Sequence, residues 1–206
     1  MLLVLVVAQL VLPGIATQDL RDRLAKSGRV LEVKISAFPA IQLLWSQADR
    51  VVVRMDTYTS HPSHLSSLLD QASGVGTLDA SANRLQAGLL VLHSASLRKR
   101  GDDVTGVATV TNADVQAALP IVSGVSLVGS SGGQVTLQGT ATALGVSATI
   151  QVIVSAQNGN LVVAPNLPFG GLATITLFSN PHLAVQSVSG QAAPGGFTVT
   201  ATGRLQ

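Results

Sequence analysis

From Val115 to Gly203 the chain contains no Asp, Glu, Lys or Arg, so nearly half of it must fold without a charged side chain. Within this stretch apolar residues alternate with Thr, Ser and Gln over 135–143, 146–156 and 197–203. A period of two indicates strands with one covered face. Asn158-Gly159, between two such runs, is typical of a tight hairpin. The charge-free half is therefore predicted to be antiparallel β-structure.

The first half of the chain shows the same alternation, interrupted by short helical patterns. We expect strands over 31–36, 51–59, 104–111 and twice within 75–98, with a hairpin around Gly101. A helix is expected over 17–29, capped by Thr17, and a second one is expected to start with Asn112 as its cap. These elements predict an α+β, mostly β fold, in which a long curved, largely antiparallel sheet wraps around one or two helices.

The N-terminus, MLLVLVVAQLVLPGIA, is almost wholly apolar. Its length lies between that of a signal-peptide core and that of a membrane span, and small residues precede a possible cleavage point after Ala16. We interpret residues 1–16 as a signal peptide or N-terminal membrane anchor, which predicts export, and 17–206 as a single β-rich domain. A buried core helix is the alternative for residues 1–16.

No pattern in the chain indicates catalysis, and we expect no catalytic residue, no metal and no cofactor. There is no cysteine, and none of the ten acidic residues stands in the setting of a catalytic carboxylate pair. His61 and His64 have the spacing of two zinc ligands, but Pro62 separates them and no third ligand is near, so a loop is predicted. The Gly-rich 128–135 lacks the lysine and helix of a phosphate loop and predicts a hairpin turn.

The charges also argue against nucleic acid as a partner. The formal net charge is only +2, and the basic run at 98–100 is too short for a nucleic-acid-binding patch. We interpret this run as a solvated hairpin tip, with contact to anionic lipid as the functional alternative.

Several separate motifs, in order along the chain, resemble one known family. LEVKISAFP leads into a turn with Ala37-Phe38-Pro39, and a short apolar helix pattern with Leu43-Leu44 precedes DRVVV. Further matches follow at 109–115 (TVTNADV), 167–169 (LPF) and 196–203 (GFTVTATG). Together they are similar to the LmeA-like phospholipid-binding family, over residues 30 to 203.

The resemblance implies a fold similar to tubular lipid-binding domains and a protein of the actinobacterial cell envelope. It implies phospholipid as the ligand, the membrane surface as a partner, and a role in elongating the mannan of lipomannan. Acyl chains would lie in an apolar groove. Two alternatives stay open: an anchored envelope scaffold without a lipid ligand, and an enzyme acting on a glycolipid.

The residues from Phe38 to Trp45 raise a question of their own, because Trp45 is the only tryptophan of the chain. Pro39 suits the first turn of a helix, after which apolar side chains recur on one face. This helix either covers one end of the sheet or forms the mouth of a lipid groove. The lipid-binding residues we expect are Phe38, Pro39, Ile41, Leu44, Trp45, Arg50, Arg54, Leu167 and Phe169.

Overall fold

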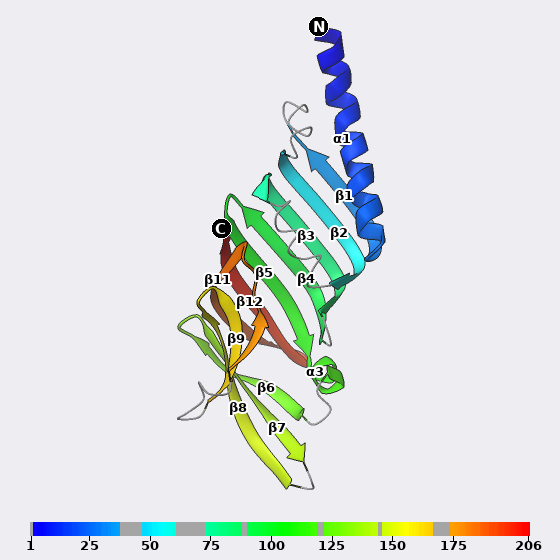
Figure 1. Cartoon of the computed structure of the whole chain (residues 1–206). Helices are drawn as coiled ribbons and strands as arrows, with labels where there is room; N and C mark the ends of the chain where they lie inside the picture. The colour runs from blue at the N-terminus through cyan, green and yellow to red at the C-terminus, as the bar shows by residue number, and fades with distance from the viewer. Residues whose placement is uncertain are drawn as a thin grey trace.

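A computed structural model of the protein describes residues 2–37, 47–60, 73–87, 90–118, 122–143, 146–166 and 174–206. The described chain forms two helices and twelve strands (Figure 1). The helices are α1 (Leu2–Ala25) and α3 (Asn112–Ala118). The strands are β1 (Gly28–Ser36), β2 (Ala48–Ser60), β3 (Val75–Ala87), β4 (Leu90–Arg100), β5 (Asp103–Thr111), β6 (Val122–Ser131), β7 (Gln134–Ala143), β8 (Val146–Gln157), β9 (Asn160–Pro165), β10 (Ile175–Phe178), β11 (Leu183–Ala193) and β12 (Gly196–Leu205).

The strands are divided between two open, curved sheets. The large sheet has the order β1-β2-β3-β4-β5-β12-β11, and the small sheet has the order β10-β9-β8-β7-β6. The predicted α+β, mostly β class and the largely antiparallel pairing are confirmed. The expectation of one long sheet is corrected to two, and β2 pairs with β3 in parallel. A parallel pair needs a crossover connection, and the chain between Ser60 and Val75 supplies it.

The hairpins predicted from turn chemistry are present. Asn158 and Gly159 have φ values of 51° and 78°, as a two-residue loop between β8 and β9 requires. Gly132 and Gly133, with φ values of 60° and 75°, turn the chain between β6 and β7. Gly101, at φ 57°, does the same between β4 and β5. The charge-free half thus forms the whole small sheet, β11, and β12 as far as Gly203.

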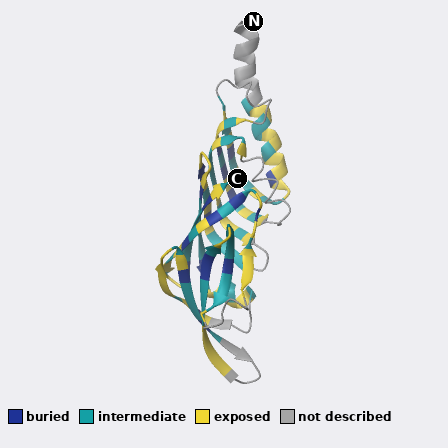
Figure 2. Cartoon of the chain, turned by 60° about the vertical axis from the view of Figure 1, so that its left-hand side comes forward, coloured by how far each residue is buried: buried dark blue, intermediate teal, exposed yellow. Residues whose placement is uncertain are grey.

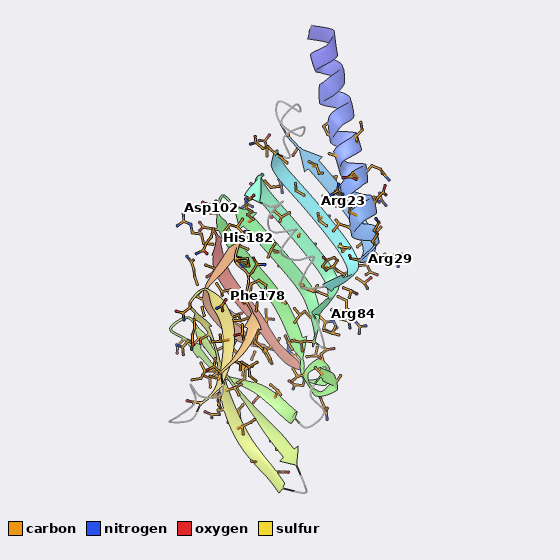
Figure 3. The ribbon with its side chains drawn as sticks, in the orientation of Figure 1. Arg23, Arg29, Arg84, Asp102, Phe178 and His182 are labelled. Carbon is orange, nitrogen blue, oxygen red and sulfur yellow. The ribbon has the colours of Figure 1, made fainter. Side chains whose placement is uncertain are left out.

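The core lies in several clusters along the sheets. The small sheet packs on β11 and β12, where Val135 is 1% exposed and Val188 is fully buried. Phe178 of β10 contacts this cluster and also a second one around Val104 and Leu183, so it lies between the two sheets (Figure 3). In Figure 2 the buried residues are distributed along the strands of both sheets. Val125 of β6 also packs on Val110 and Phe197, so the small sheet covers the β11 side of the large sheet and the end at which β5 stops and β12 begins.

The helix α1 covers the opposite end of the large sheet. Leu20 and Leu24 pack against Val33, Val51 and the neighbouring apolar residues of β1 to β3. The helix runs without a break from Leu2 through Thr17, so the predicted helix start at Thr17 is wrong. It lies antiparallel to β1, and its N-terminal end projects beyond the sheet (Figure 1). Among the described residues, none of the helices combines the length and the apolar character that crossing a membrane requires.

The short helix α3 is capped by Thr111 and not, as predicted, by Asn112. The Thr111 hydroxyl oxygen accepts a hydrogen bond from the Asp114 backbone N–H at 3.2 Å, and the same hydroxyl donates to the Asp114 carboxylate. His93 of β4 contacts that carboxylate at 2.9 Å. Asp114 therefore joins the cap of α3 to the large sheet.

The pKa of the Asp114 carboxyl reflects these contacts. Burial acts to raise it, but the hydrogen bonds from Thr111 and His93 and the nearby charge of His93 together hold the pKa below its ordinary value. A carboxyl whose pKa is lower in the folded state stabilises the fold at neutral pH. That contribution is lost as the pH falls through its folded-state pKa.

Replacing Asp114 with Ala is expected to lower the free energy of unfolding by about 1–2 kcal/mol at neutral pH, because the hydrogen bonds of its carboxylate with Thr111 and His93 are lost. Urea denaturation measures the change, and the difference from wild type should shrink below about pH 4. The exposed Asp103 offers a control, since Asp103→Ala should change stability by no more than about 0.5 kcal/mol. Equal effects of the two substitutions would contradict this role of Asp114.

Candidate functional site

One face of the large sheet is apolar from edge to edge, and its middle is lined by small residues. The pairing register brings Ala80, Leu97, Gly106, Ala201 and Val188 into one row across β3, β4, β5, β12 and β11. We call the small side chains at the centre of this face the small-residue band: Ala80, Ala82, Gly106, Ala108 and Ala201. All five are half-buried.

Space above the sheet differs between the band and the covered end. A Cβ added at Gly106 would meet no described atom closer than 4.0 Å. A Cβ added at Gly190, on β11, would meet Leu127 at 3.1 Å and Val135 at 3.2 Å, because the small sheet packs closely there. The band is therefore an apolar strip that is open above Gly106 and extends from Ala80 and Ala82, which pack against the cluster under α1, towards the part covered by the small sheet.

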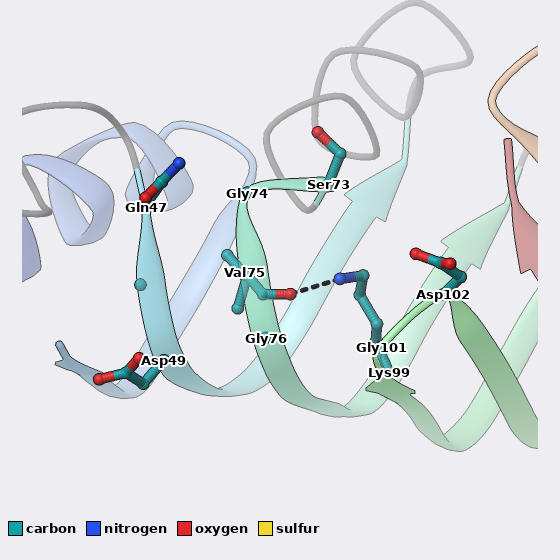
Figure 4. A pocket seen from close by; sticks show the side chains of 10 residues that line it. Gln47, Asp49, Ser73, Gly74, Val75, Gly76, Lys99, Gly101 and Asp102 are labelled. Carbon is teal, nitrogen blue, oxygen red and sulfur yellow. Dashed lines mark hydrogen bonds between the residues drawn. The ribbon is translucent and has the colours of Figure 1, made fainter. Parts of the chain in front are cut away.

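A lysine interrupts this apolar face at one end of the strip. Lys99 lies between Leu78 and Val104 in the register, and the residue is only 2% exposed. Its stem lies among apolar side chains, and its ammonium group donates a hydrogen bond to the Val75 carbonyl oxygen (Figure 4). Burial lowers the pKa of Lys99, and the nearby Asp102 carboxylate partly offsets this effect.

A cavity of about 330 Å³ opens beside Lys99, at the end of the sheet where β3 begins and β4 ends. Gly76 and Gly101, joined by a 3.1 Å backbone hydrogen bond, form part of its wall and contribute no side chain. Asp102 lies on the same side of Val75 as Lys99, and Asp49 lies on the β2 side (Figure 4). This end of the strip thus combines an open apolar surface with one buried cation and two carboxylates.

The opposite face of the large sheet carries exposed charge. Arg50 contacts Asp79 at 3.0 Å, and Arg54 contacts Glu32 at 3.0 Å. Both arginines were expected at a lipid head group. The structure places them in ion pairs on the face that points away from the small-residue band.

The other expected binding residues lie outside the described residues: Phe38, Pro39, Ile41, Leu44, Trp45, Leu167 and Phe169. The described residues that flank the first five are Ala37 and Gln47, and Gln47 lines the cavity beside Lys99. His61 and His64 also lie outside the described residues. Their prediction as loop residues is untested.

The sequence interpretation missed Lys99. The run 98–100 was expected to be a solvated tip, which is correct for Arg98 and Arg100 and wrong for Lys99. The signal was present in the alternation of β4, since Lys99 has the same parity as Leu97 and Ala95. In a strand that parity places all three on one face, which here is the apolar one.

The described residues show no arrangement that indicates metal binding. Within the part of the chain that the structure covers, no three His, Asp or Glu side chains lie together as metal ligands would. Several of the described carboxylates are held in ion pairs with arginine or histidine, as Asp79, Asp114 and Asp56 are.

Comparison with known proteins identifies the family to which the chain belongs. The sequence matches the family described as LmeA-like phospholipid-binding over residues 5–202, which is nearly the whole chain. No curated protein and no solved structure matches the chain. The motifs that suggested this resemblance extend over almost the same residues. The chain belongs to the LmeA-like phospholipid-binding family.

Proposed function

We propose that the protein holds a phospholipid with its acyl chains along the small-residue band and its phosphate at the end marked by Lys99. The observation that carries this proposal is the open apolar strip at Gly106, in a chain whose family binds phospholipid. Residues with larger side chains would fill this strip, whereas Ala and Gly leave room for a flexible ligand.

The energetics of such binding are favourable. Burying one CH₂ group contributes about 0.8 kcal/mol, so ten buried groups contribute about 8 kcal/mol. That gain is comparable with the estimated 4–15 kcal/mol that association loses in translational and rotational freedom. Ten buried groups therefore offset much of this loss, and further buried groups or the head group supply the net affinity.

Lys99 is the residue suited to meet the phosphate. Its ammonium group carries three donors, and one of them bonds to the Val75 carbonyl oxygen. A hydrogen bond to an ionised phosphate is stronger than one to a neutral carbonyl. The cavity beside Lys99 has room for a polar group next to the end of the strip.

We further propose that the protein works outside the cytoplasmic membrane, as a lipid carrier or lipid-binding factor that supports lipomannan elongation. The apolar segment 1–16 supports export, by cleavage or as an anchor. The roles of an envelope scaffold without a lipid and of a glycolipid enzyme are less well supported, because the apolar strip and the family both favour lipid binding and the described carboxylates form no recognisable catalytic pair.

Protein purified gently from a bacterial membrane should carry phospholipid in near-stoichiometric amount, measured by mass spectrometry of an organic extract. Gly106→Leu should reduce the bound lipid several-fold, because the new side chain fills the strip. Gly129 is the matched control: it lies on β6 with nothing within 4 Å of an added Cβ, so Gly129→Leu should leave the lipid content unchanged. Lipid-free wild-type protein that also ignores added vesicles would refute the proposed function.

Lys99→Met should weaken phospholipid binding about ten-fold or more, which corresponds to one lost charge-assisted hydrogen bond. Binding of diacylglycerol, which has no phosphate, should not change. Stability in urea should stay within about 1 kcal/mol of wild type or rise, because a buried ion is replaced by an apolar side chain of similar length. An unchanged phospholipid affinity would exclude Lys99 from the head-group site.

Trp45 is a built-in probe, since the chain has no other tryptophan. If the segment 38–45 forms the mouth of the groove, adding phospholipid vesicles should shift the tryptophan emission to the blue, as its ring leaves water. Trp45→Ala should abolish the signal, and Gly106→Leu should reduce it. Unshifted emission in protein shown to hold lipid would place Trp45 away from the ligand.

A further inference from the structure

The charged face of the large sheet displays a group of exposed cations with two less exposed carboxylates among them. We call this group the basic patch; its members come from β1, β2 and β4 and are Lys34, Arg50, Arg54, Arg98 and Arg100. Their side chains are between 59% and 73% exposed, whereas the two carboxylates among them, Glu32 and Asp79, are 27% and 23% exposed. A partner approaching this face therefore meets positive charge first.

The ion pairs of the patch leave most of its charge uncompensated. Asp79 is shared by three arginines, with Arg50 at 3.0 Å, Arg98 at 3.4 Å and Arg100 at 4.0 Å. Glu32 is shared by Lys34 and Arg54. Within the patch, five cations against two carboxylates leave a formal charge of +3, although the whole chain carries only +2.

The patch reaches the end of the sheet at which the apolar strip meets its cavity. Arg98 and Arg100 flank Lys99 in β4, so the three side chains alternate between the charged face and the apolar face. In the register, Arg50, Thr77 and Arg100 form one row across β2, β3 and β4, next to the cavity-lining residues. The N-terminal end of α1 projects beyond the sheet at this same end (Figure 1).

We propose that the basic patch docks the protein on the surface of an anionic phospholipid bilayer. This inference rests on the proposed function and adds the surface through which the lipid is reached. A bilayer presents many phosphates in one plane, and the patch presents five cations spread over one face of a sheet, so several contacts form together. Arg50, Arg98 and Arg100 lie at the Lys99 end of the sheet, so docking through them brings that end of the strip to the membrane, where a lipid enters or leaves.

A nucleic acid is a poorer fit to the same charges. The patch has no aromatic side chain on which bases would stack. The chain also belongs to a family described as phospholipid-binding. The charge complementarity, the family and the position of the cavity all favour the bilayer.

The test compares matched triple variants in vesicle co-sedimentation. Arg50, Arg98 and Arg100 are changed to Gln in one protein, and Arg23, Arg29 and Arg84, which lie outside the patch on α1, β1 and β3, are changed to Gln in the other (Figure 3). Vesicles are phosphatidylcholine with or without phosphatidylglycerol. The patch variant should bind the anionic vesicles about a hundred-fold more weakly than wild type, at about five-fold for each arginine, and the control variant should lose far less.

A substitution that removes a negative charge instead of positive ones makes the test more specific. Asp79→Asn removes a negative charge from the patch without touching a cation, so it should strengthen binding to anionic vesicles several-fold. Added salt should weaken the binding of wild type and of Asp79→Asn alike, because exposed charges are screened. Equal losses in the two triple variants, or no gain in Asp79→Asn, would overturn the inference.

Further measurements separate this inference from the proposed function. The patch variant should still bind a dispersed short-chain phospholipid like wild type, because the small-residue band is intact. If it does so and also sediments with vesicles like wild type, the docking surface is wrong and the proposed function stands. If wild type binds neither lipid form, the proposed function itself fails. If wild type binds duplex DNA as tightly as anionic vesicles, the patch is a general polyanion site and the inference is overturned.

Discussion

The alternation of side chains across the large sheet is the constraint on which the other features depend. In β2 and β4 successive residues point to opposite faces, so Val51 and Val53 face one way while Arg50 and Arg54 face the other. A shift of one residue in the register would bury the arginines and expose the valines. The register therefore keeps an apolar face and a charged face apart on a single layer of backbone.

The apolar face of the large sheet must be shielded from water, and other elements of the chain cover parts of it. The helix α1 contributes Leu20 and Leu24 at one end, and the small sheet packs on β11 and β12 at the other. Between these covers most side chains are Ala and Gly, with Leu97 among them. Because small residues bury little area, this stretch contributes less to stability than the clusters beside it, which is consistent with a surface kept for a ligand.

Local features of the fold could be predicted from the sequence, and long-range ones could not. The period of two located most strands, and Asn158-Gly159 located a hairpin, because both depend on neighbouring residues. The division into two sheets and the parallel pairing of β2 with β3 depend on which distant edges meet. The cap of α3 is a local feature, since Thr111 and Asp114 are three residues apart, and only the contact of Asp114 with His93 of β4 is long-range. Of the candidate site, the sequence indicated an apolar groove and identified the family, but not the position of Lys99.

At the end of the strip, β4 places Lys99 on the apolar face of the sheet and Arg98 and Arg100 on the charged face. A cation on the apolar face is unfavourable by itself, since burial opposes its charge. The Val75 carbonyl oxygen and the Asp102 carboxylate offset this penalty only in part, so the ammonium group gains from any further anion that reaches the cavity. Arg98 and Arg100, one residue away on either side, add positive potential at the same end of the sheet without entering the strip. An amphiphile with an anionic head is therefore favoured in one orientation, with its phosphate at this end and its chains along the small residues.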